Sequence, residues 1–214
     1  MAQRAGRKKA VTDLKRGLIL HAARRVFEAD GLDGASLRAI AAAAGYTPAA
    51  LYFHFDSKEA IYAEVLRGSL VNLAEAVTRA TLRSKTPAKR LRAAAMAFFN
   101  YYADNPRDLD LGFYLFRGGM KPRGLGKKRD QALNASLAAA LTPIAYAAEA
   151  LGARPDAAKT LMVDTFAHAA GLLLLAHTGR MRRFGASAPK LMQRFVDSKI
   201  AALTDKPDQR RSRR

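Results

Sequence analysis

Apolar residues recur every three to four positions along most of this chain, which is the spacing of an amphipathic α-helix. Thr12 or Asp13 can cap the first such helix, and Gly31 ends it. Its stripe comprises Leu14, Leu18, Ala22 and Val26, with Ile19, Ala23 and Phe27 beside them.

The same spacing predicts eight further helices over 36–44, 48–53, 57–84, 87–104, 107–117, 128–151, 156–177 and 188–203. Pro143 should kink or divide the helix in which it lies. No segment alternates as a strand does, so we predict an all-α fold of about nine helices. The apolar run 166–176 is too short for a membrane span of about 20 residues, and His168 interrupts it.

Residues 36–58 carry the clearest local signals. Ser36 can cap a helix, and Gly45 supplies the backbone freedom of a tight turn. Thr47 followed by Pro48 provides a cap and a first-turn proline, which start the next helix. Two short helices joined in this way form a helix-turn-helix, whose second helix fits the DNA major groove.

The net charge of +19 suggests a polyanionic partner, either nucleic acid or an anionic membrane surface. Part of this charge lies in the two tails, and a solubilising role is the simpler explanation for it. The chain has no cysteine, which excludes disulfides, thiol chemistry and cysteine zinc sites. No apolar run follows the basic first residues as in a secretion signal, so we expect a cytoplasmic protein without a membrane partner.

The stretch from Ile19 to Val65 resembles the DNA-binding domain of TetR/AcrR-type transcriptional regulators. The resemblance rests on AARRVFEADG, on Ser36 with the Ala44-Gly45 turn, and on the run TPAALYFHFDSKE from Thr47. It covers about a quarter of the chain. In this family the C-terminal part is variable and binds a small-molecule signal.

The resemblance implies a division into functional parts. We expect a disordered basic arm over 1–11, a DNA-binding domain over 12–56 and a ligand-binding and dimerisation domain over 57–204. A basic tail over 205–214 follows. The arm is either a solvated tail or a contact to phosphates or a minor groove.

The start of the 48–53 helix suits contact with base edges. Thr47 can hydrogen-bond a base or a phosphate, while Pro48 and Ala49 can touch thymine methyls or simply initiate the helix. Few direct base contacts are available here, so DNA shape can add to specificity. Ser36 can cap its helix and also meet a phosphate, and Arg38 points either to DNA or to solvent.

Other assignments come from the resemblance. It implies that the ring of Tyr52 packs on the helix-turn-helix while its hydroxyl reaches a phosphate. It places His54 next to the DNA backbone and gives Lys58 a phosphate contact, aided by the positive end of the following helix. Packing is the role we expect for Ile40, Leu51, Phe53 and Phe55.

The helices 156–177 and 188–203, eighth and ninth in the predicted order, can form a four-helix interface in a homodimer, as in the family. The alternative is that 156–177 is the buried centre of a monomer; we expect it to serve both purposes, with one face inward and one toward the partner. Such a dimer would bind a palindromic double-stranded operator.

An effector cavity, if present, lies among the helices from 87 to 177. Asp164 and His168 can hold a polar group of a ligand, or form a buried hydrogen-bonded pair. The other candidates for its wall, which are first of all core residues, are Phe98, Phe99, Tyr102, Phe113, Phe116, Tyr146, Met162 and Phe166. We expect no cofactor and no metal site.

The leading interpretation is a ligand-responsive DNA-binding repressor. The alternatives are a constitutive architectural DNA-binding protein, a helical enzyme using Asp164 and His168, and a membrane-surface protein bound through its basic tails. Against the enzyme alternative, the sequence shows no recognisable nucleophile, metal-ligand set or glycine-rich phosphate loop.

The basic loop 117–129 is either solvated or guides an anionic ligand such as an acyl thioester.

Overall fold

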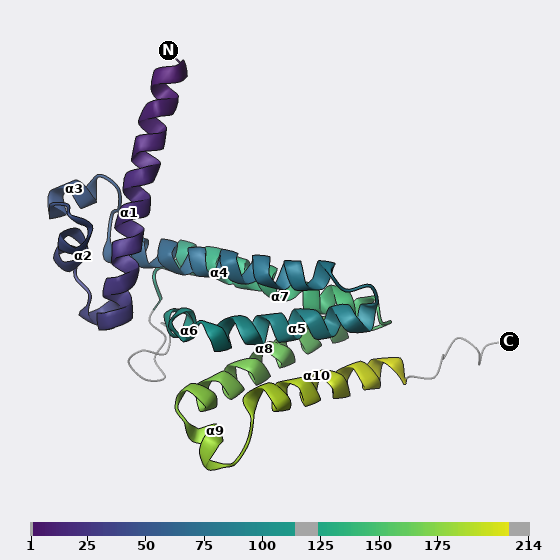
Figure 1. Cartoon of the computed structure of the whole chain (residues 1–214). Helices are drawn as coiled ribbons and strands as arrows, with labels where there is room; N and C mark the ends of the chain where they lie inside the picture. The colour runs from purple at the N-terminus through teal and green to yellow at the C-terminus, as the bar shows by residue number, and fades with distance from the viewer. Residues whose placement is uncertain (1, 114–123, 206–214) are drawn as a thin grey trace. The chain divides into compact units, whose positions relative to one another are not determined.

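The computed structural model describes residues 2–113 and 124–205, with side chains from residue 6 onward, and all regular structure in them is helical. The helices are α1 (Ala2–Gly34), α2 (Leu37–Ala44), α3 (Pro48–Tyr52), α4 (Lys58–Leu82), α5 (Pro87–Asp104), α6 (Pro106–Gly112), α7 (Lys127–Glu149), α8 (Pro155–His177), α9 (Arg180–Arg183) and α10 (Ala188–Thr204) (Figure 1). The prediction of an all-α fold is confirmed. Within the described ranges there are ten helices; α9 is the one without a predicted counterpart, so the ninth predicted helix is α10.

Several expected boundaries need correction. Residues 2–11 continue α1 rather than forming a disordered arm, because Ala, Lys and Arg favour helix and no proline interrupts them. Helical geometry breaks at Gly31 (φ 69°), as predicted. One helix, α7, runs through Pro143 undivided. The segment 206–214 of the basic tail and the segment 117–123 of the basic loop lie outside the described residues.

The chain divides into two compact units. Unit 1 comprises Met1–Leu70 and Arg107–Asn134, and unit 2 comprises Val71–Pro106 and Ala135–Arg214. Both α4 and α7 therefore contribute residues to each unit. The boundary expected at residue 57 concerns function and stays a prediction.

The core of unit 1 forms where α1 packs on α2 and α2 packs on α3. Its largest side chains with at most 1% exposure are Ile19, Phe27, Ile40, Leu51, Ile61 and Tyr62. The rings of Phe27 and Tyr62 meet edge to face at 4.8 Å, and the Tyr62 hydroxyl donates to the Leu111 carbonyl at 2.8 Å. Ile19 and Phe27 of the predicted α1 stripe are thus buried, as expected.

The beginning of that stripe is not buried. Leu14 is 66% exposed and Leu18 is 52% exposed. Figure 1 shows the reason, since the N-terminal half of α1 extends past α2 and α3. Helical periodicity alone therefore did not predict burial at the start of this stripe, where the described part of unit 1 leaves both leucines exposed.

An ion pair links α6 to α1 within unit 1. Asp108 is 2% exposed and accepts a hydrogen bond from the guanidinium of Arg24, while Arg107 pairs with Glu28 at 2.8 Å. Removing one partner of a buried ion pair leaves the charge of the other without a counter-charge, which destabilises the fold.

Asp108→Ala is therefore expected to lower the free energy of unfolding by about 2–3 kcal/mol, below the fully buried range because solvent still reaches the partner arginine. Urea unfolding followed by circular dichroism measures this change. Asp30→Ala removes an exposed carboxylate of the same unit and should change stability by less than about 0.5 kcal/mol. Equal losses in the two variants would show that the Asp108 pair contributes nothing specific.

Unit 2 is a helical bundle in which α8 packs on α5, α9 and α10, and α10 packs on α5. Arg92 of α5 donates to the Asp197 carboxylate of α10 at 2.8 Å. By length and composition α8 is long and apolar enough to cross a membrane, but only 28% of its most apolar 18-residue stretch is buried. The exposed apolar surface of α8 is therefore a property that its function must explain.

Candidate functional site

The helix-turn-helix is held by the local interactions that the sequence predicts. The Ser36 hydroxyl accepts from the Ala39 amide at 3.1 Å, and the Thr47 hydroxyl accepts from the Ala50 amide at 3.2 Å. Gly45 ends α2 in the left-handed region with φ 72°, where glycine carries no steric penalty. These interactions start and stop α2 and α3 with a defined turn between them.

One side of α3 faces solvent. Thr47, Pro48 and Ala49 are exposed, and Tyr52 is 59% exposed, whereas Leu51 is buried at 1%. The hydroxyl of a threonine that accepts at a cap still has its proton to donate. The first turn of α3 therefore offers a small, accessible surface with one hydrogen-bonding side chain. Arg38 on α2 is also exposed.

The packing role expected for Phe53 is wrong. Its side chain is 90% exposed at the end of α3. The buried aromatic of this turn is Phe55, which is 4% exposed. In a turn, the spacing of two aromatics does not tell which one faces the core, so sequence reasoning missed the exposed ring.

Lys58 has a structural role that the sequence did not reveal. Its ammonium donates to the carbonyls of Leu32 at 2.9 Å and Ala35 at 3.2 Å, with Asp33 at 3.4 Å. These carbonyls follow the break in α1, where the helix no longer supplies partners. Lys58 therefore fastens the start of α4 to the end of α1, and its phosphate contact stays a prediction.

Lys58→Met is expected to lower the free energy of unfolding by about 1.5–3 kcal/mol, the usual contribution of a hydrogen bond to a charged group. Thermal and urea unfolding measure it. Lys85→Met, at an exposed lysine of unit 2, is the matched control and should have little effect. A Lys58 variant as stable as this control would mean that the three carbonyl contacts do not stabilise the fold.

Arg16 fixes the turn that follows α3. Its guanidinium donates to the His54 carbonyl and to the Glu64 carboxylate. It also lies 4.3 Å above the centre of the Phe55 ring, within the range of a cation–π contact. These contacts hold the half-buried His54 beside α1. Sequence reasoning overlooked Arg16, because its partners are 38 and 48 residues away along the chain.

The candidate effector residues are only partly brought together. Phe98 meets the rings of Tyr102 at 5.3 Å and Phe166 at 5.9 Å, both edge to face. Phe99 is buried, and burial raises the pKa of the Tyr102 hydroxyl, with the neighbouring Tyr101 adding to the effect. This aromatic cluster of α5 and α8 is the part of the predicted pocket wall that forms one group.

Other candidates do not join that cluster. Tyr146 is 68% exposed, and Met162 is half-buried on α8. Phe113 belongs to unit 1, and Phe116 lies outside the described residues. Because α8 is apolar on nearly every side, its residue pattern does not distinguish the positions that turn inward.

Of the two roles expected for Asp164 and His168, the buried hydrogen-bonded pair does not form, and the contact with a ligand stays a prediction. Asp164 is exposed and pairs with Lys199 at 3.1 Å, while His168 stacks on Phe195 at 4.2 Å. The pKa of His168 is lowered by burial and by the charge of Lys199, against a backbone hydrogen bond at Leu191. The two side chains thus do not form the pair that a catalytic role would use. In the ranges that the structure describes, no three His, Asp or Glu residues group as a metal site.

A strip of small and apolar residues faces solvent on α8. Val163 and Leu174 are each 52% exposed, and Ala167 and Gly171 between them are exposed too. These positions recur at intervals of four, four and three, so they share one helix face. Small residues between two larger apolar ones leave room for the close approach of another helix.

Comparison with known proteins relates this arrangement to a family. Residues 19–65 match the family described as "Bacterial regulatory proteins, tetR family". Over 89 residues the chain is 39% identical to the HTH-type transcriptional activator FasR of Mycolicibacterium smegmatis, covering 42% of this chain and 41% of that protein. Over 59 residues it is 44% identical to the HTH-type transcriptional repressor KstR2 of Rhodococcus jostii, covering 28% and 29%. The chain thus aligns with less than half the length of either relative.

Solved structures share the fold over most of the chain. One from Rhodococcus sp. RHA1, a protein with unknown function, superposes with a TM-score of 0.71 and 24% identity over 89% of this chain and 96% of that one. The transcriptional regulator FadR of Bacillus subtilis, solved in complex with stearoyl-CoA, gives a TM-score of 0.63 and 15% identity over 89% and 98%. At these identities the likeness concerns the fold.

Proposed function

Because this chain belongs to the TetR family of transcriptional regulators, we propose that it is a dimeric repressor released from a palindromic operator by a small molecule. Members of this family bind DNA and are regulators rather than enzymes. Their place of action is the cytoplasm, which we propose for this chain as well. The observation that carries the proposal is the exposed first turn of α3, supported on a buried Leu51.

Reading of the operator rests on Thr47 and the residues beside it. With its lone pair used at the cap, Thr47 can donate its hydroxyl proton to a base acceptor such as N7 or O6 of guanine. Pro48 and Ala49 present apolar surface for thymine methyl groups. The exposed Tyr52 and Ser36 reach toward phosphates, which fix orientation without reading sequence. Arg38 adds a further cation near the backbone.

The second subunit is proposed to cover the apolar strip of α8, together with α10. A single three-helix head reads too few bases for strong selection, so a two-fold dimer is needed to read two half-sites. The two α3 helices must then lie about 34–36 Å apart to enter successive major grooves. The strip from Val163 to Leu174 supplies the surface that a partner helix would bury.

The effector is proposed to bind at the aromatic cluster of Phe98, Tyr102 and Phe166. An apolar chain with a polar end suits such a site. The FadR structure of Bacillus subtilis contains stearoyl-CoA, so long acyl-CoA thioesters are the first compounds to test. A coupling of about 1–3 kcal/mol between effector and operator is sufficient for a useful switch.

The direction of regulation is proposed from the family, whose members are typically repressors. The two sequence relatives carry opposite names, one an activator and one a repressor. Repression by promoter occupancy predicts that the operator overlaps a transcription start.

Sequencing of genomic fragments captured by the purified protein tests the proposal. We expect a shared palindrome, positioned across promoters, that is released when stearoyl-CoA is added. Capture of fragments with no common sequence would contradict operator recognition. Unchanged operator affinity across saturating acyl-CoA thioesters of different chain length would contradict the proposed effector class, while leaving operator recognition intact.

A further inference from the structure

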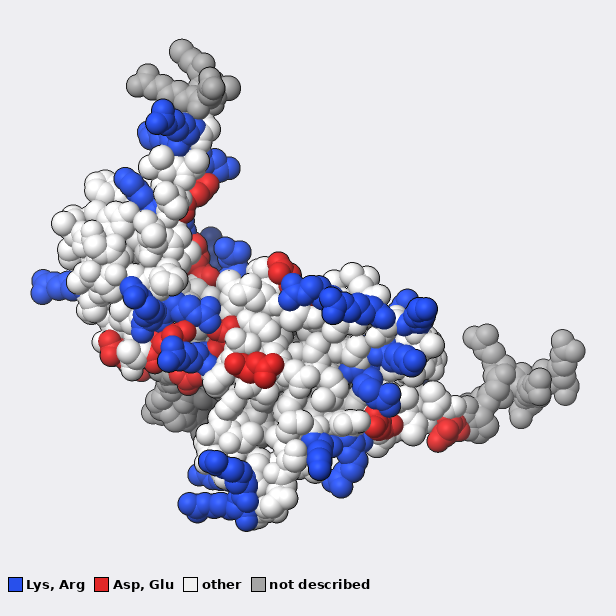
Figure 2. Space-filling view, viewed as in Figure 1, with Lys and Arg blue, Asp and Glu red and all other residues white. Residues whose placement is uncertain are grey.

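The N-terminal half of α1 forms one wall of a groove in unit 1. Figure 1 shows this part of the helix extending past α2 and α3, and Figure 2 shows Lys and Arg side chains along it. The groove has a volume of about 450 Å³. It is lined by Arg7, Lys8, Val11, Thr12, Lys15 and His54.

The lining residues of α1 share one helix face. At 3.6 residues per turn, positions 7, 8, 11, 12 and 15 fall within an arc of about 140°. Asp13, the acidic residue of this segment, falls on the opposite side by the same geometry. None of the six described residues that line the groove is acidic.

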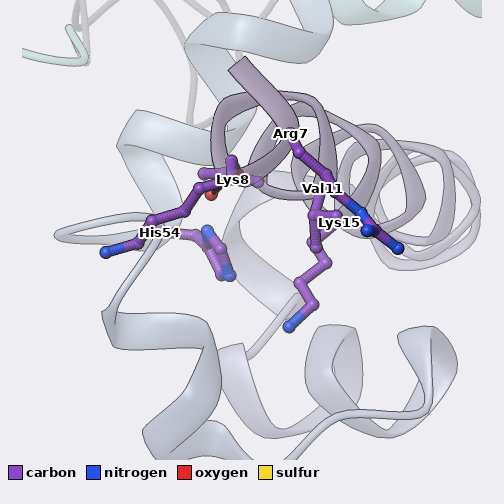
Figure 3. A pocket seen from close by; sticks show the side chains of 6 residues that line it. Arg7, Lys8, Val11, Lys15 and His54 are labelled. Atoms are coloured by element: carbon purple, nitrogen blue, oxygen red, sulfur yellow. Dashed lines mark hydrogen bonds between the residues drawn. The ribbon is translucent and has the colours of Figure 1, made fainter. Parts of the chain in front are cut away.

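The other wall is the turn after α3, and it is firmly held. Arg16 binds the carbonyl of His54, so this residue keeps a fixed position next to α1. Figure 3 shows the side chains of Lys8 and Lys15 on either side of the His54 ring. The Thr12 hydroxyl donates to the Lys8 carbonyl at 3.0 Å, one turn earlier on the same helix. The groove is therefore built from a helix and an anchored turn.

The three cationic side chains that line the groove, Arg7, Lys8 and Lys15, give it a positive potential that attracts an anion. His54 follows Tyr52 and Phe53, which end the exposed recognition helix, so the groove lies next to the surface proposed for the major groove. A DNA strand that passes α3 would bring its phosphates to this position. The ligand chemistry that fits is a phosphodiester.

We propose that this groove binds at least one backbone phosphate of duplex DNA, between Lys8, Lys15 and His54. The inference rests on the proposed DNA-binding function and extends it. It makes the helical N-terminal half of α1 part of the DNA interface, beyond the helix-turn-helix itself. Because phosphates carry no base identity, the groove adds affinity and not sequence preference.

The salt dependence of DNA binding tests the groove. The variant Lys8→Gln/Lys15→Gln should reduce the slope of log affinity against log salt by about 0.9 for each phosphate that the two lysines neutralise. The ratio of wild-type to variant affinity for DNA then falls by about 3.5-fold per neutralised phosphate as the salt concentration rises from 50 to 200 mM. Operator and scrambled DNA should lose affinity equally. Both lysines are exposed, so thermal stability should not change.

The matched control is Lys85→Gln/Lys89→Gln, which removes the same charge from exposed lysines of unit 2. Its slope should equal that of the wild type. If the groove variant behaves as this control does, the inference is overturned. Failure of the proposed function has a different signature, since the wild type itself would then show no preference for the operator.

A second variant separates a helical groove from a flexible basic arm. Ala10→Pro keeps every charge but breaks the helix between Lys8 and Lys15. The buried core of α1 begins only at Ile19, so the rest of unit 1 should stay folded. The groove predicts a slope reduced by about 0.9. If the salt-dependence slope is the same as that of the wild type, the charge alone matters, and the proposal that a helical groove binds the phosphate is overturned.

Discussion

Leu174→Arg is expected to convert the protein into a monomer and to weaken operator binding by at least about 100-fold. Leu174 is 52% exposed at one end of the apolar strip of α8. At a two-fold interface the same side chain occurs twice, so the variant buries two unpaired charges, which is strongly unfavourable. Two joined DNA-binding heads gain about 10²- to 10⁴-fold in avidity over one, and the monomer loses this gain.

Light scattering after size exclusion measures the oligomeric state, and titration of labelled operator measures the affinity. Leu82→Arg is the matched control, because Leu82 is 80% exposed in unit 2 but lies outside the α8 strip. The control should remain dimeric and bind as the wild type does. A Leu174 variant that stays dimeric with full affinity would place the subunit interface elsewhere.

Thr47→Ala has the second large expected effect, a loss of operator affinity of about 10- to 100-fold with a much smaller loss on scrambled DNA. A direct side-chain contact to a base contributes up to about 1–3 kcal/mol of discrimination, and the dimer makes the contact in each half-site. The same change removes the cap on Ala50, which costs about 1 kcal/mol of stability. Unfolding measurements therefore accompany the titrations.

Thr47→Asn separates the two roles of this residue. Asparagine caps a helix at least as well as threonine, so stability should be preserved. Its amide favours adenine, so the preferred base at the contacted position should change in a selection from randomised operators. If Thr47→Ala weakens operator and scrambled DNA to the same extent, the residue acts only through the fold and not through a base.

Sequence reasoning succeeded where the signals are local. The caps at Ser36 and Thr47 and the turn at Gly45 each depend on residues within one helical turn, so the helix-turn-helix was predictable in detail. The helix expected over 57–84 was equally clear, and its apolar residues at helical spacing are buried: Ile61, Val65, Leu66, Leu70, Leu73 and Val77.

Errors arose where tertiary contacts determine whether a side chain is buried and which groups it contacts. Leu14 has the correct helical phase, yet it is 66% exposed, because burial depends on what packs against the helix and not on the spacing along it. The partners of Lys58 are carbonyls 23 to 26 residues away, and those of Arg24 include a carboxylate 84 residues away. No spacing rule along the chain encodes such contacts. For α8, uniform apolarity concealed which face meets the core and which is exposed.

The central claim is that the exposed turn at Thr47, presented twice by a dimer, reads a defined DNA sequence. The most direct test is the affinity and stoichiometry of the purified protein on its genomic palindrome and on a scrambled copy, at 150 mM salt. The account predicts two chains per palindrome and binding at least about 1,000-fold tighter than to the scrambled DNA. Comparable affinity for the two duplexes, or a single chain per palindrome, would contradict it.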